Sequence, residues 1–387
     1  MANDAPIRVL HLASWYPSAV HRTLGNFVQR HVQAIATVAP SELLYAAPVP
    51  RGSAVRPGVE VVRRSGVLEK TVYFQARKPV VRGVTRALLE AAEAMELAPD
   101  VVHLHVGYPA GAAARELARK WNVPLVMTEH WTAYQKGPGK RLGFWQRRAL
   151  KKTGAAATMV CPVSDDLGTA MQSFGIRGPE RFRTVPNVVD TRLFHPLPAS
   201  DVQQDRFTLL HVSSLVDRQK NISGMLRALQ RCLPDLPQLE VVILGDGDPS
   251  PHEELALKLG IAGQVTFGGE LPLGAVARRM READALLLFS HFENFPCVIG
   301  EAWASGIPVI SSDVGGIREH LGPELGILVP PGDEAALADA IAFTVSSKWN
   351  REVLRSTAEG LFSIPVVAEA YLEVYRTAIG RQSSGTA

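Results

Sequence analysis

Residues 290–310 read SHFENFPCVIGEAWASGIPVI, and they carry the strongest structural signal in the chain. Pro296 suits the first position of a helix and Gly306 suits the position just past its end, so together they bracket a helix of about ten residues. The helix follows a strand that we expect to end near Ser290. Free backbone N–H groups and a positive partial charge make such a helix N-terminus a site for a phosphate group.

Two glutamates accompany this helix. Glu293 lies just before it and Glu301 lies about five residues inside it, which is ~7.5 Å further along at the helical rise. Carboxylates at that separation can bind hydroxyl groups on either side of a diphosphate, a sugar at one end and a ribose at the other. The alternative is that both are solvated glutamates on a surface helix. The Asn-Phe-Pro turn at 294–296 and the bracketed helix favour the binding site.

Strand and helix patterns alternate along the whole chain, which is typical of βαβ units and a parallel sheet. Residues 192–205 have no periodic apolar pattern and contain Pro196, Pro198 and Ser200, so we expect an interdomain linker there. The α/β chain then consists of two doubly wound, Rossmann-like domains, residues 1–191 and 206–365. Ligands should bind at the carboxyl ends of the strands, in the cleft between the domains.

These residues resemble the donor-site signature of family-4 retaining glycosyltransferases of the GT-B fold, of the group 1 type that builds surface polysaccharides. The resemblance covers roughly residues 7 to 340. Besides 293–309, it includes Gly25-Asn-Phe-Val, Val102-His-Leu-His105, Thr128-Glu-His130, Val163-Ser164, Val185-Pro-Asn-Val-Val-Asp190, Leu244-Gly-Asp-Gly247, Phe267-Gly-Gly and Asp313-Val-Gly-Gly316. It implies that the amphipathic C-terminal helix, within 366–387, packs back on the first domain.

One segment departs from the family pattern. The family usually carries Gly-Arg-Leu-x3-Lys-Gly after the first strand of the second domain, and its Arg and Lys neutralise the leaving diphosphate. Here residues 213–221 read SSLVDRQKN, with Ser214 at the Arg position and a spacing to Lys220 that is longer by one. Lys220 is the candidate for the diphosphate contact. Arg218 is the candidate for the missing cation, and the alternative is a solvent-facing Arg in a loop.

The resemblance also implies roles for individual residues. Retention by front-face attack lets the diphosphate help to take the acceptor proton, and fixed cations and helix amides stabilise its charge. Glu293 would then hold sugar hydroxyls and Glu301 the ribose. The donor-binding turn is Asn294, Phe295 and Pro296, and Gly25 lies near the diphosphate.

On the first domain, the resemblance places His130 beside the donor sugar, near the reacting carbon. The alternative is a histidine that is satisfied in the core. His105 is our candidate on the acceptor side, because only one of His103 and His105 need point into the cleft.

Composition excludes several classes of protein. The 387 residues carry a net charge of +3, which is too small to indicate nucleic-acid binding. The three cysteines form no C-x-x-C pair, no apolar run is long enough for a membrane span, and we expect no secretory signal sequence. Asp246-Gly-Asp248 is interpreted as a loop, so no metal or cofactor is expected. A cytoplasmic protein fits these features.

The segment 136–152 is basic and contains interleaved apolar side chains. Its cations are Lys136, Lys140, Arg141, Arg147, Arg148, Lys151 and Lys152. Such a segment could rest on an anionic membrane, at its inner face, or hold a lipid-diphosphate acceptor. The alternative is a solvated basic face whose apolar stripe packs on the first domain. Arg77, Lys78, Arg82 and Arg86 form a smaller cluster that could share this surface.

The sequence therefore predicts a metal-independent retaining glycosyltransferase. Its donor is a nucleotide sugar, and its acceptor is a glycan or lipid-linked glycan in surface or extracellular polysaccharide biosynthesis. A nucleotide-sugar 2-epimerase of similar fold is the alternative among enzymes. A non-catalytic nucleotide-sugar-binding protein is the alternative outside enzymes, and Ser214 is its best support. The nucleotide base, the sugar, the acceptor and the oligomeric state leave no readable pattern.

Overall fold

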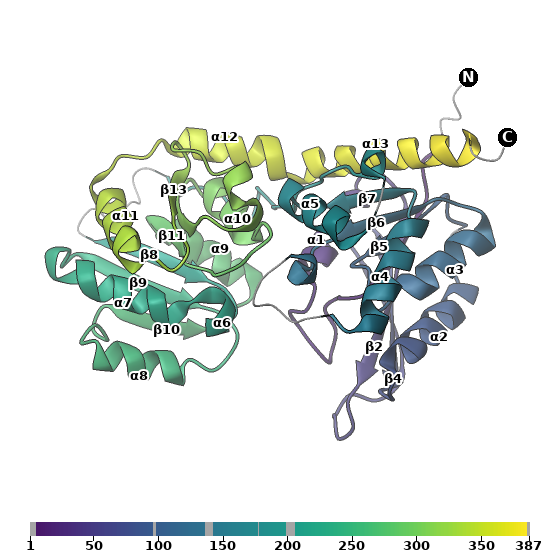
Figure 1. The fold of residues 1–387 in the computed structure, drawn as a ribbon, viewed down its shortest axis with the longest axis horizontal. Helices are drawn as coiled ribbons and strands as arrows, with labels where there is room; N and C mark the ends of the chain where they lie inside the picture. The colour runs from purple at the N-terminus through teal and green to yellow at the C-terminus, as the bar shows by residue number, and fades with distance from the viewer. Residues whose placement is uncertain (1–4, 96–97, 136–141, 177, 199–205, 385–387) are drawn as a thin grey trace. The chain divides into compact units, whose positions relative to one another are not determined.

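The computed structural model describes residues 5–95, 98–135, 142–176, 178–198 and 206–384. The chain divides into two compact units. The first comprises Met1–Val188 and Ile364–Ala387, and the second comprises Val189–Ser363. Each is an α/β unit with its own sheet and its own core, and each is described separately below (Figure 1).

The first unit is built on a seven-stranded sheet with the order β3-β4-β2-β1-β5-β6-β7. All neighbouring strands are parallel except β3 and β4, which form an antiparallel hairpin. The strands are β1 (Val9–Ala13), β2 (Ser41–Val49), β3 (Gly58–Arg64), β4 (Val67–Gln75), β5 (Val101–His105), β6 (Leu125–Glu129) and β7 (Met159–Pro162). The pattern of the sequence did not predict β2, β3 or β4. β3 is exposed along almost its whole length, so no apolar alternation marks it.

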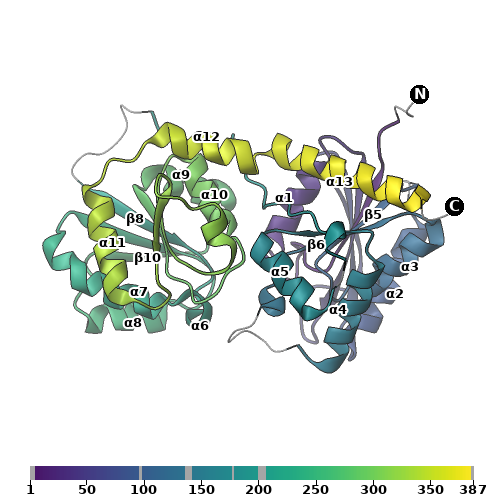
Figure 2. The ribbon, with the colours of Figure 1, turned by 45° about the horizontal axis from the view of Figure 1, so that its top comes forward.

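Helices cover both faces of this sheet. On one face lie α1 (Asn26–Ile35) and α13 (Ile364–Ser384), and on the other lie α2 (Val80–Glu93), α3 (Gly111–Trp121), α4 (Phe144–Ala156) and α5 (Asp165–Phe174). Figure 2 shows α13 and α1 together on one side, with α2, α3 and α4 on the other. Because side chains alternate along a strand, Val9 packs with α1 and α13 whereas Leu10 packs with the opposite helices.

Helix α13 belongs to the first unit although it ends the chain. Tyr371 and Tyr375 are fully buried and pack with Val9, Val126 and other residues of the sheet. The phenol of Tyr375 lies 2.7 Å from Nδ1 of His103. The last helix is therefore part of the first unit's core, and it also closes over the face that carries the histidines discussed below.

The second unit has a six-stranded parallel sheet with the order β10-β9-β8-β11-β12-β13. Its strands are β8 (Phe207–Val212), β9 (Leu239–Leu244), β10 (Val265–Gly269), β11 (Ala285–Leu288), β12 (Val309–Ser312) and β13 (Gly326–Val329). One face is covered by α7 (Ile222–Cys232), α8 (Ser250–Lys258) and α11 (Glu334–Ser346), and the other by α9 (Leu273–Glu282), α10 (Cys297–Ala304) and α12 (Arg351–Phe362). The one-turn helix α6 (Asp217–Lys220) follows β8.

The segment expected as a linker differs from the observed division. The second unit begins at Val189, and Phe194 is fully buried in its core. The Arg355 guanidinium donates to the carbonyl oxygens of Thr191 and Phe194 at 2.9 and 2.8 Å. Residues 192–198 are thus an integral part of the second unit, because one buried aromatic side chain and one partly buried arginine hold them there despite the prolines. Residues 199–205 of the expected linker lie outside the described residues.

Candidate functional site

Each sheet has one place where the strand order reverses direction, and ligands of doubly wound folds bind at the carboxyl ends of those strands. In the second unit, the chain runs from β8 outward to β10 and then resumes at β11 on the other side of β8. The loops that leave β8 and β11 therefore diverge at this edge. The first loop leads into α6, and the second, residues 289–296, leads into α10.

The two loops are joined by a nearly buried ion pair. Lys220 Nζ lies 2.5 Å from Glu293 Oε1, and the two side chains are 13% and 8% exposed. The His291 N–H donates to the Gln219 carbonyl at 2.8 Å, which ties the same loops through their backbones. Two of the residues expected to bind donor are thus brought together although they are far apart in sequence.

Helix α10 starts one residue later than expected. Pro296 is its N-cap in extended conformation rather than its first helical residue, and no side chain caps it. At the other end Gly306 has φ +74°, and the Ile307 N–H bonds the Ala302 carbonyl at 3.1 Å, a Schellman ending. Because the N-cap residue is a proline, it has no side-chain oxygen to cap the first N–H groups of α10, and the positive end of the helix dipole lies at this turn.

Both glutamates are buried, which contradicts the alternative of two solvated glutamates on a surface helix. Glu293 is 6% exposed and Glu301, the fifth residue of α10, is 2% exposed. Phe295 is also buried, and its ring stacks on that of Phe362 with centroids 5.2 Å apart. Phe295 can therefore contribute only its backbone to a ligand. The backbone carbonyl of Asn294 accepts a hydrogen bond from the Gly316 N–H at 2.9 Å, which fixes the backbone of the turn.

A second loop presses on the backbone of Glu293. Gly315 has φ +57°, and a Cβ at this position would lie 2.0 Å from the Glu293 carbonyl oxygen. No other residue fits that approach without moving one of the two loops. The family-like sequence Asp313-Val-Gly-Gly316 thus has a structural reason, because it lets the 313–316 loop support the turn that carries Glu293.

Two buried hydroxyl groups lie at the same edge of the sheet. Ser290 Oγ follows β11 and Ser312 Oγ ends β12, and neither has a hydrogen-bond partner within the described part of the chain. An unsatisfied buried polar group costs about 1–3 kcal/mol. Their place at the carboxyl edge fits a site that a polar ligand completes.

Arg218 and Ser214 lie in the loop and short helix that follow β8. Arg218 is exposed, and no ion pair links it to another described residue. Ser214 is partly buried, and its carbonyl accepts from the Ser213 hydroxyl at 2.9 Å. Arg218 is therefore available to a ligand at this edge, and its role there stays a prediction.

In the first unit, the corresponding edge lies where β1 and β5 end. Gly25, which precedes α1, has φ +71°, and a Cβ there would lie 2.4 Å from the Trp15 carbonyl oxygen. Only glycine allows the loop after β1 to pass so close to the helix N-terminus. The structure thus explains why glycine stands at this position, while its expected contact with the donor diphosphate stays a prediction.

His130 comes directly after β6 and is held by a buried carboxylate that the sequence analysis did not single out. Glu129 Oε1 accepts from the N–H groups of His130 and Trp131 at 2.9 and 3.0 Å. Its Oε2 accepts from the Gly107 N–H and the Tyr134 hydroxyl, both at 3.0 Å. Burial raises the pKa of Glu129, and these four donors oppose that rise. The Thr-Glu-His string marked this residue, but only its burial reveals the role.

The ring of His130 is partly buried between Phe27 and His31, with centroid distances of 4.4 and 5.1 Å. Burial lowers its pKa well below the usual value, so the imidazole is neutral near pH 7. His105, expected on the acceptor side, is fully buried and offers no exposed atom. His103 is buried on the same face, because residues two apart on a strand point the same way.

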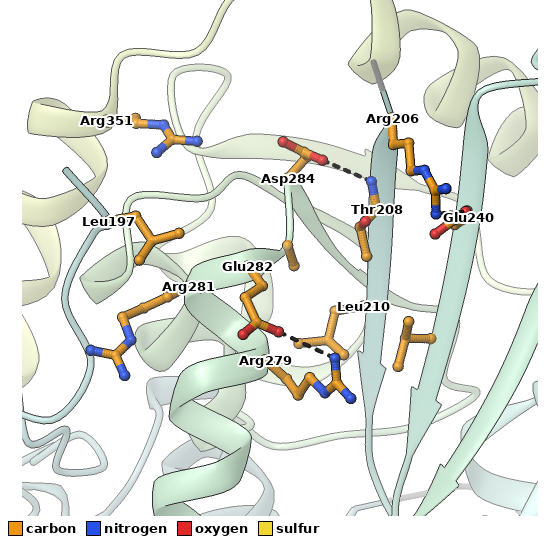
Figure 3. Close-up of a pocket in the computed structure, with 12 residues that line it drawn as sticks. Leu197, Arg206, Thr208, Leu210, Glu240, Arg279, Arg281, Glu282, Asp284 and Arg351 are labelled. Carbon is orange, nitrogen blue, oxygen red and sulfur yellow. Dashed lines mark hydrogen bonds and ion pairs between the residues drawn. The ribbon is translucent and has the colours of Figure 1, made fainter. Parts of the chain in front are cut away.

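A separate pocket of about 390 Å³ lies at the opposite edge of the second unit's sheet. Figure 3 shows Arg206, Thr208 and Asp284 lining it, at the beginnings of β8 and β11. The Asp284 carboxylate accepts from the Thr208 N–H at 2.7 Å, and burial raises the pKa of Asp284. None of the residues expected from the sequence to bind donor lines this pocket, so we do not assign it to the donor.

Two family models match the chain. That of the glycosyl transferases group 1 matches residues 198–360, and that of the glycosyltransferase family 4 matches residues 37–193. Together they cover the second unit and most of the first. Their border falls close to the observed division of the chain.

Similar proteins agree with this match. The TuaC glycosyltransferase of Bacillus subtilis, named for teichuronic acid biosynthesis, is 28% identical over 96% of this chain and 98% of its own length. A D-inositol 3-phosphate glycosyltransferase of Geodermatophilus obscurus is 30% identical over 72% of this chain and 66% of its own.

Solved structures share the fold at lower identity. Sucrose-phosphate synthase from Thermosynechococcus elongatus has a TM-score of 0.80 at 21% identity, covering 97% of this chain and 100% of that one. Anabaena HepE, solved with UDP and glucose, has a TM-score of 0.74 at 19% identity, covering 96% and 99%. The chain is a glycosyltransferase that belongs to the group 1, family 4 glycosyltransferases of the GT-B fold.

Proposed function

We propose that this glycosyltransferase transfers a sugar from a nucleotide-sugar donor to a glycan or lipid-linked glycan, with retention of configuration and without a metal. One observation carries the proposal. At the carboxyl ends of β8 and β11, the Lys220–Glu293 ion pair and the N-terminus of α10 belong to the same edge of one sheet. That edge is where doubly wound folds bind nucleotides.

The charges at this edge suit a leaving diphosphate. The Lys220–Glu293 pair is neutral as a whole, so it cannot offset two phosphate charges by itself. Arg218 on the same short helix adds a cation, and the first N–H groups of α10 add a positive dipole. Cations and oriented amides that face developing negative charge lower the barrier of group transfer.

The carboxylates suit the two hydroxyl-bearing ends of a donor. Lys220 Nζ lies 2.5 Å from Glu293 Oε1 and holds the carboxylate in one position. The carboxylate is therefore already oriented to accept hydrogen bonds from sugar hydroxyls. Glu301, buried in α10, is proposed to bind the ribose hydroxyls. The backbone of Asn294, Phe295 and Pro296 forms the turn between these two groups.

Retention is proposed to follow from front-face attack, in which the departing diphosphate helps to take the acceptor proton. On the first unit, the neutral imidazole of His130 is proposed to lie beside the donor sugar and Gly25 beside the diphosphate. Because the Glu129 carboxylate accepts from the backbone N–H groups of His130 and Trp131, the backbone that carries the ring is fixed before substrate binds. The proposed chemistry needs no bound metal ion.

The nature of donor and acceptor is inferred from relatives. HepE was solved with UDP and glucose, which supports a nucleotide-sugar donor for this chain as well. TuaC, which aligns over nearly the full length of both chains, is named for teichuronic acid biosynthesis. We therefore propose that the protein acts in the cytoplasm, in the biosynthesis of a surface or extracellular polysaccharide.

A lipid-linked acceptor would require contact with a membrane surface, and α4 has the side chains for it. Phe144 and Trp145 at its start are 70% and 77% exposed. Arg147, Arg148, Lys151 and Lys152 are exposed along the helix, whereas Leu150 is buried and anchors it. Exposed aromatic rings beside cations are typical of helices that lie on anionic lipid. Lys136, Lys140 and Arg141 lie outside the described residues.

Among the described residues, every helix is too short or too polar to cross a bilayer. The exposed cations Arg77, Lys78, Arg82 and Arg86, at and before α2, are proposed to extend the basic surface.

Membrane contact is tested by sedimenting the protein with vesicles of phosphatidylglycerol and of phosphatidylcholine. We expect binding to the anionic vesicles only, weakening as salt shortens the screening length. Changing Arg147, Arg148, Lys151 and Lys152 to Gln should abolish it. Changing Arg119 and Lys120 on α3 to Gln, which are also exposed, is the matched control. No sedimentation with anionic vesicles at low salt would contradict the membrane proposal.

The proposed reaction is tested by incubating the protein with a panel of nucleotide sugars and acceptors, with and without EDTA. We expect transfer that persists in EDTA, and a product whose anomeric configuration by NMR matches the donor. Inversion, or complete loss of transfer in EDTA, would contradict the mechanism. An epimer formed without any acceptor would favour the 2-epimerase instead.

A further inference from the structure

Five histidines from four segments of the first unit form one cluster. They are His11 on β1, His31 on α1, His103 and His105 on β5, and His130 after β6. Neighbouring ring centroids are close, at 4.1 Å for His103–His105 and 5.1 Å for His31–His130. The function proposed above uses only His130. The other four need a different explanation, and their hydrogen bonds provide one.

A chain of hydrogen bonds sets the tautomer of His105. The Ser41 hydroxyl donates its one proton to the Ala39 carbonyl at 2.9 Å, so Ser41 Oγ must accept from His11 Nε2 at 3.2 Å. The neutral His11 ring then has a bare Nδ1, which accepts from His105 Nε2 at 3.0 Å. His105 Nδ1 is consequently left with a lone pair.

His31 reaches the same state by a shorter route. Its Nε2 lies 3.2 Å from the Pro186 carbonyl oxygen, which can only accept, so the proton is on Nε2. Nδ1 of His31 therefore also has a lone pair. Both Nδ1 atoms are buried and have no hydrogen-bond partner among the described residues.

These lone pairs converge with a third imidazole. One ring nitrogen from each of His31, His105 and His130 lies within 4.8 Å of the other two. We propose that these three histidines form a site for a divalent transition ion of the zinc type. Imidazole nitrogens are common ligands of such ions, and three of them with one open position is a known zinc arrangement.

The surroundings fit a bound ion. Burial lowers the pKa of all three rings, so each is a neutral imidazole near pH 7, with one protonated and one bare nitrogen, and His130 also forms a hydrogen bond with Asn187. His11 and the Pro186 carbonyl bind the far sides of His105 and His31, which is how ligating histidines are usually oriented. With zinc–nitrogen bonds of about 2.0–2.1 Å, tetrahedral ligands lie roughly 3.3 Å apart, which modest tilting of the rings can reach.

A second group of three, His11, His103 and His105, has the same spacing but fits less well. Both nitrogens of His11 and both nitrogens of His103 already take part in hydrogen bonds, to His105, Ser41, Tyr375 and Thr128. An ion there would have to break these contacts. His130 is also only partly buried as a residue, whereas all three residues of the second group are fully buried.

An ion at this site would act on the reaction as an inhibitor. This consequence rests on the proposed function, in which the His130 ring lies beside the donor sugar and the transfer itself needs no metal. A ring bound to zinc has its lone pair occupied, so it can no longer accept a proton or hydrogen bond from the reacting groups. Micromolar zinc is therefore expected to lower transfer while magnesium, which prefers oxygen ligands, leaves it unchanged.

Binding is tested on the full chain after treatment with EDTA and dialysis, with zinc titrated by calorimetry and cobalt followed by visible absorption. We expect one ion per chain and the intense visible bands of tetrahedral cobalt with nitrogen ligands. His31→Gln and His130→Gln should each weaken zinc binding by at least about tenfold. His21→Gln, an exposed histidine of the same unit, is the control. Circular dichroism checks that each variant is folded, and His130→Gln, whose ring is only partly buried, guards against a misfolded His31 variant.

Two results would overturn the site. One is the absence of stoichiometric zinc binding, as expected if a buried water donates to both lone pairs. The other is zinc bound elsewhere, seen as binding that survives both variants or as sulfur-to-cobalt charge transfer that points to Cys297, a partly buried cysteine. Because binding is measured without substrate, it remains decisive even if no donor is turned over. Stoichiometric binding without any effect of zinc on an active enzyme would overturn the inhibitory role alone.

Discussion

The two units place the same residue type in the first strand of their sheets and use it differently. His11 lies in the first strand of the first unit and His211 in the first strand of the second, and both are fully buried. His11 is surrounded by other histidine rings, whereas His211 bonds the Leu287 carbonyl at 2.7 Å and the Ser213 hydroxyl at 2.6 Å.

The binding edges of the two units differ in the same way. The first unit's edge carries neutral imidazoles, and the second unit's edge carries an ion pair and a helix N-terminus. A parallel sheet thus supplies the position of a site but not its chemistry. The chemistry depends on which side chains the loops bring to that edge.

The largest effect expected on the second unit is acid destabilisation through His211. Burial lowers its pKa to about 4, from an ordinary value near 6.5. The unfolded chain then binds more protons between these values, so stability present above pH 6.5 falls as the pH drops toward 4, by on the order of 3 kcal/mol. Denaturant unfolding across this range should show a smaller slope for His211→Gln than for the parent chain.

The control for this experiment is His291→Gln, because His291 is exposed in the same unit. It should leave the slope unchanged. An identical pH slope for His211→Gln and the parent chain would mean that the neutral buried ring contributes nothing to the acid response.

The next largest effect is a loss of kcat on changing the ion pair at the binding edge of the second unit's sheet. Lys220→Ala and Glu293→Gln should each reduce kcat by roughly 100-fold, because removal of one group that stabilises transition-state charge typically costs that much. Since the two groups form one ion pair, the double variant should lose much less than the product of the single losses. Steady-state rates of the folded variants measure this, and near-normal rates in both single variants would remove the assignment of the site.

In the first unit, Gly25→Ala should lower the free energy of unfolding by about 2 kcal/mol, because a strained backbone and a steric clash combine there. Gly52→Ala is the matched control, since Gly52 also has a positive φ but a Cβ added there would meet no atom within 4 Å. The difference between the two variants in thermal or denaturant unfolding isolates the contact with Trp15. Equal losses would show that the loop after β1 moves freely away from α1.

The smallest effect concerns Glu301. Glu301→Ala should weaken donor binding by about tenfold, the magnitude of one or two lost hydrogen bonds to hydroxyl groups. The change should appear in the donor Kd by calorimetry, with kcat little altered at saturating donor. An unchanged donor Kd would contradict the ribose role and would leave Glu301 as a buried residue of α10 alone.

Much of the second unit's fold could be predicted from sequence, and so could the turn that carries its candidate site. The strands over 239–244 and the helix over 222–232 agree with the structure, because each is a continuous run with a clear apolar face. In the first unit, β2, β3, β4 and α2 were not predicted. The exposed hairpin strand β3 has no apolar periodicity, whereas β2 and β4 are buried and α2 has a buried apolar face, so the patterns of these three were missed. Local pattern identifies elements that bury one face, and it misses those stabilised mainly by their neighbours.

The sequence by itself determined the alternation of strands and helices, the glycines that fit left-handed turns, and the turn at Glu293 with the helix behind it. Tertiary structure alone decided which distant residues meet. It joined Lys220 to Glu293, and it brought His31 and His130 to His105 from three separate segments. The physical reason is range: backbone preference and side-chain periodicity act within a few residues, whereas burial, tautomers and ion pairs depend on strand order and helix packing across the whole sheet.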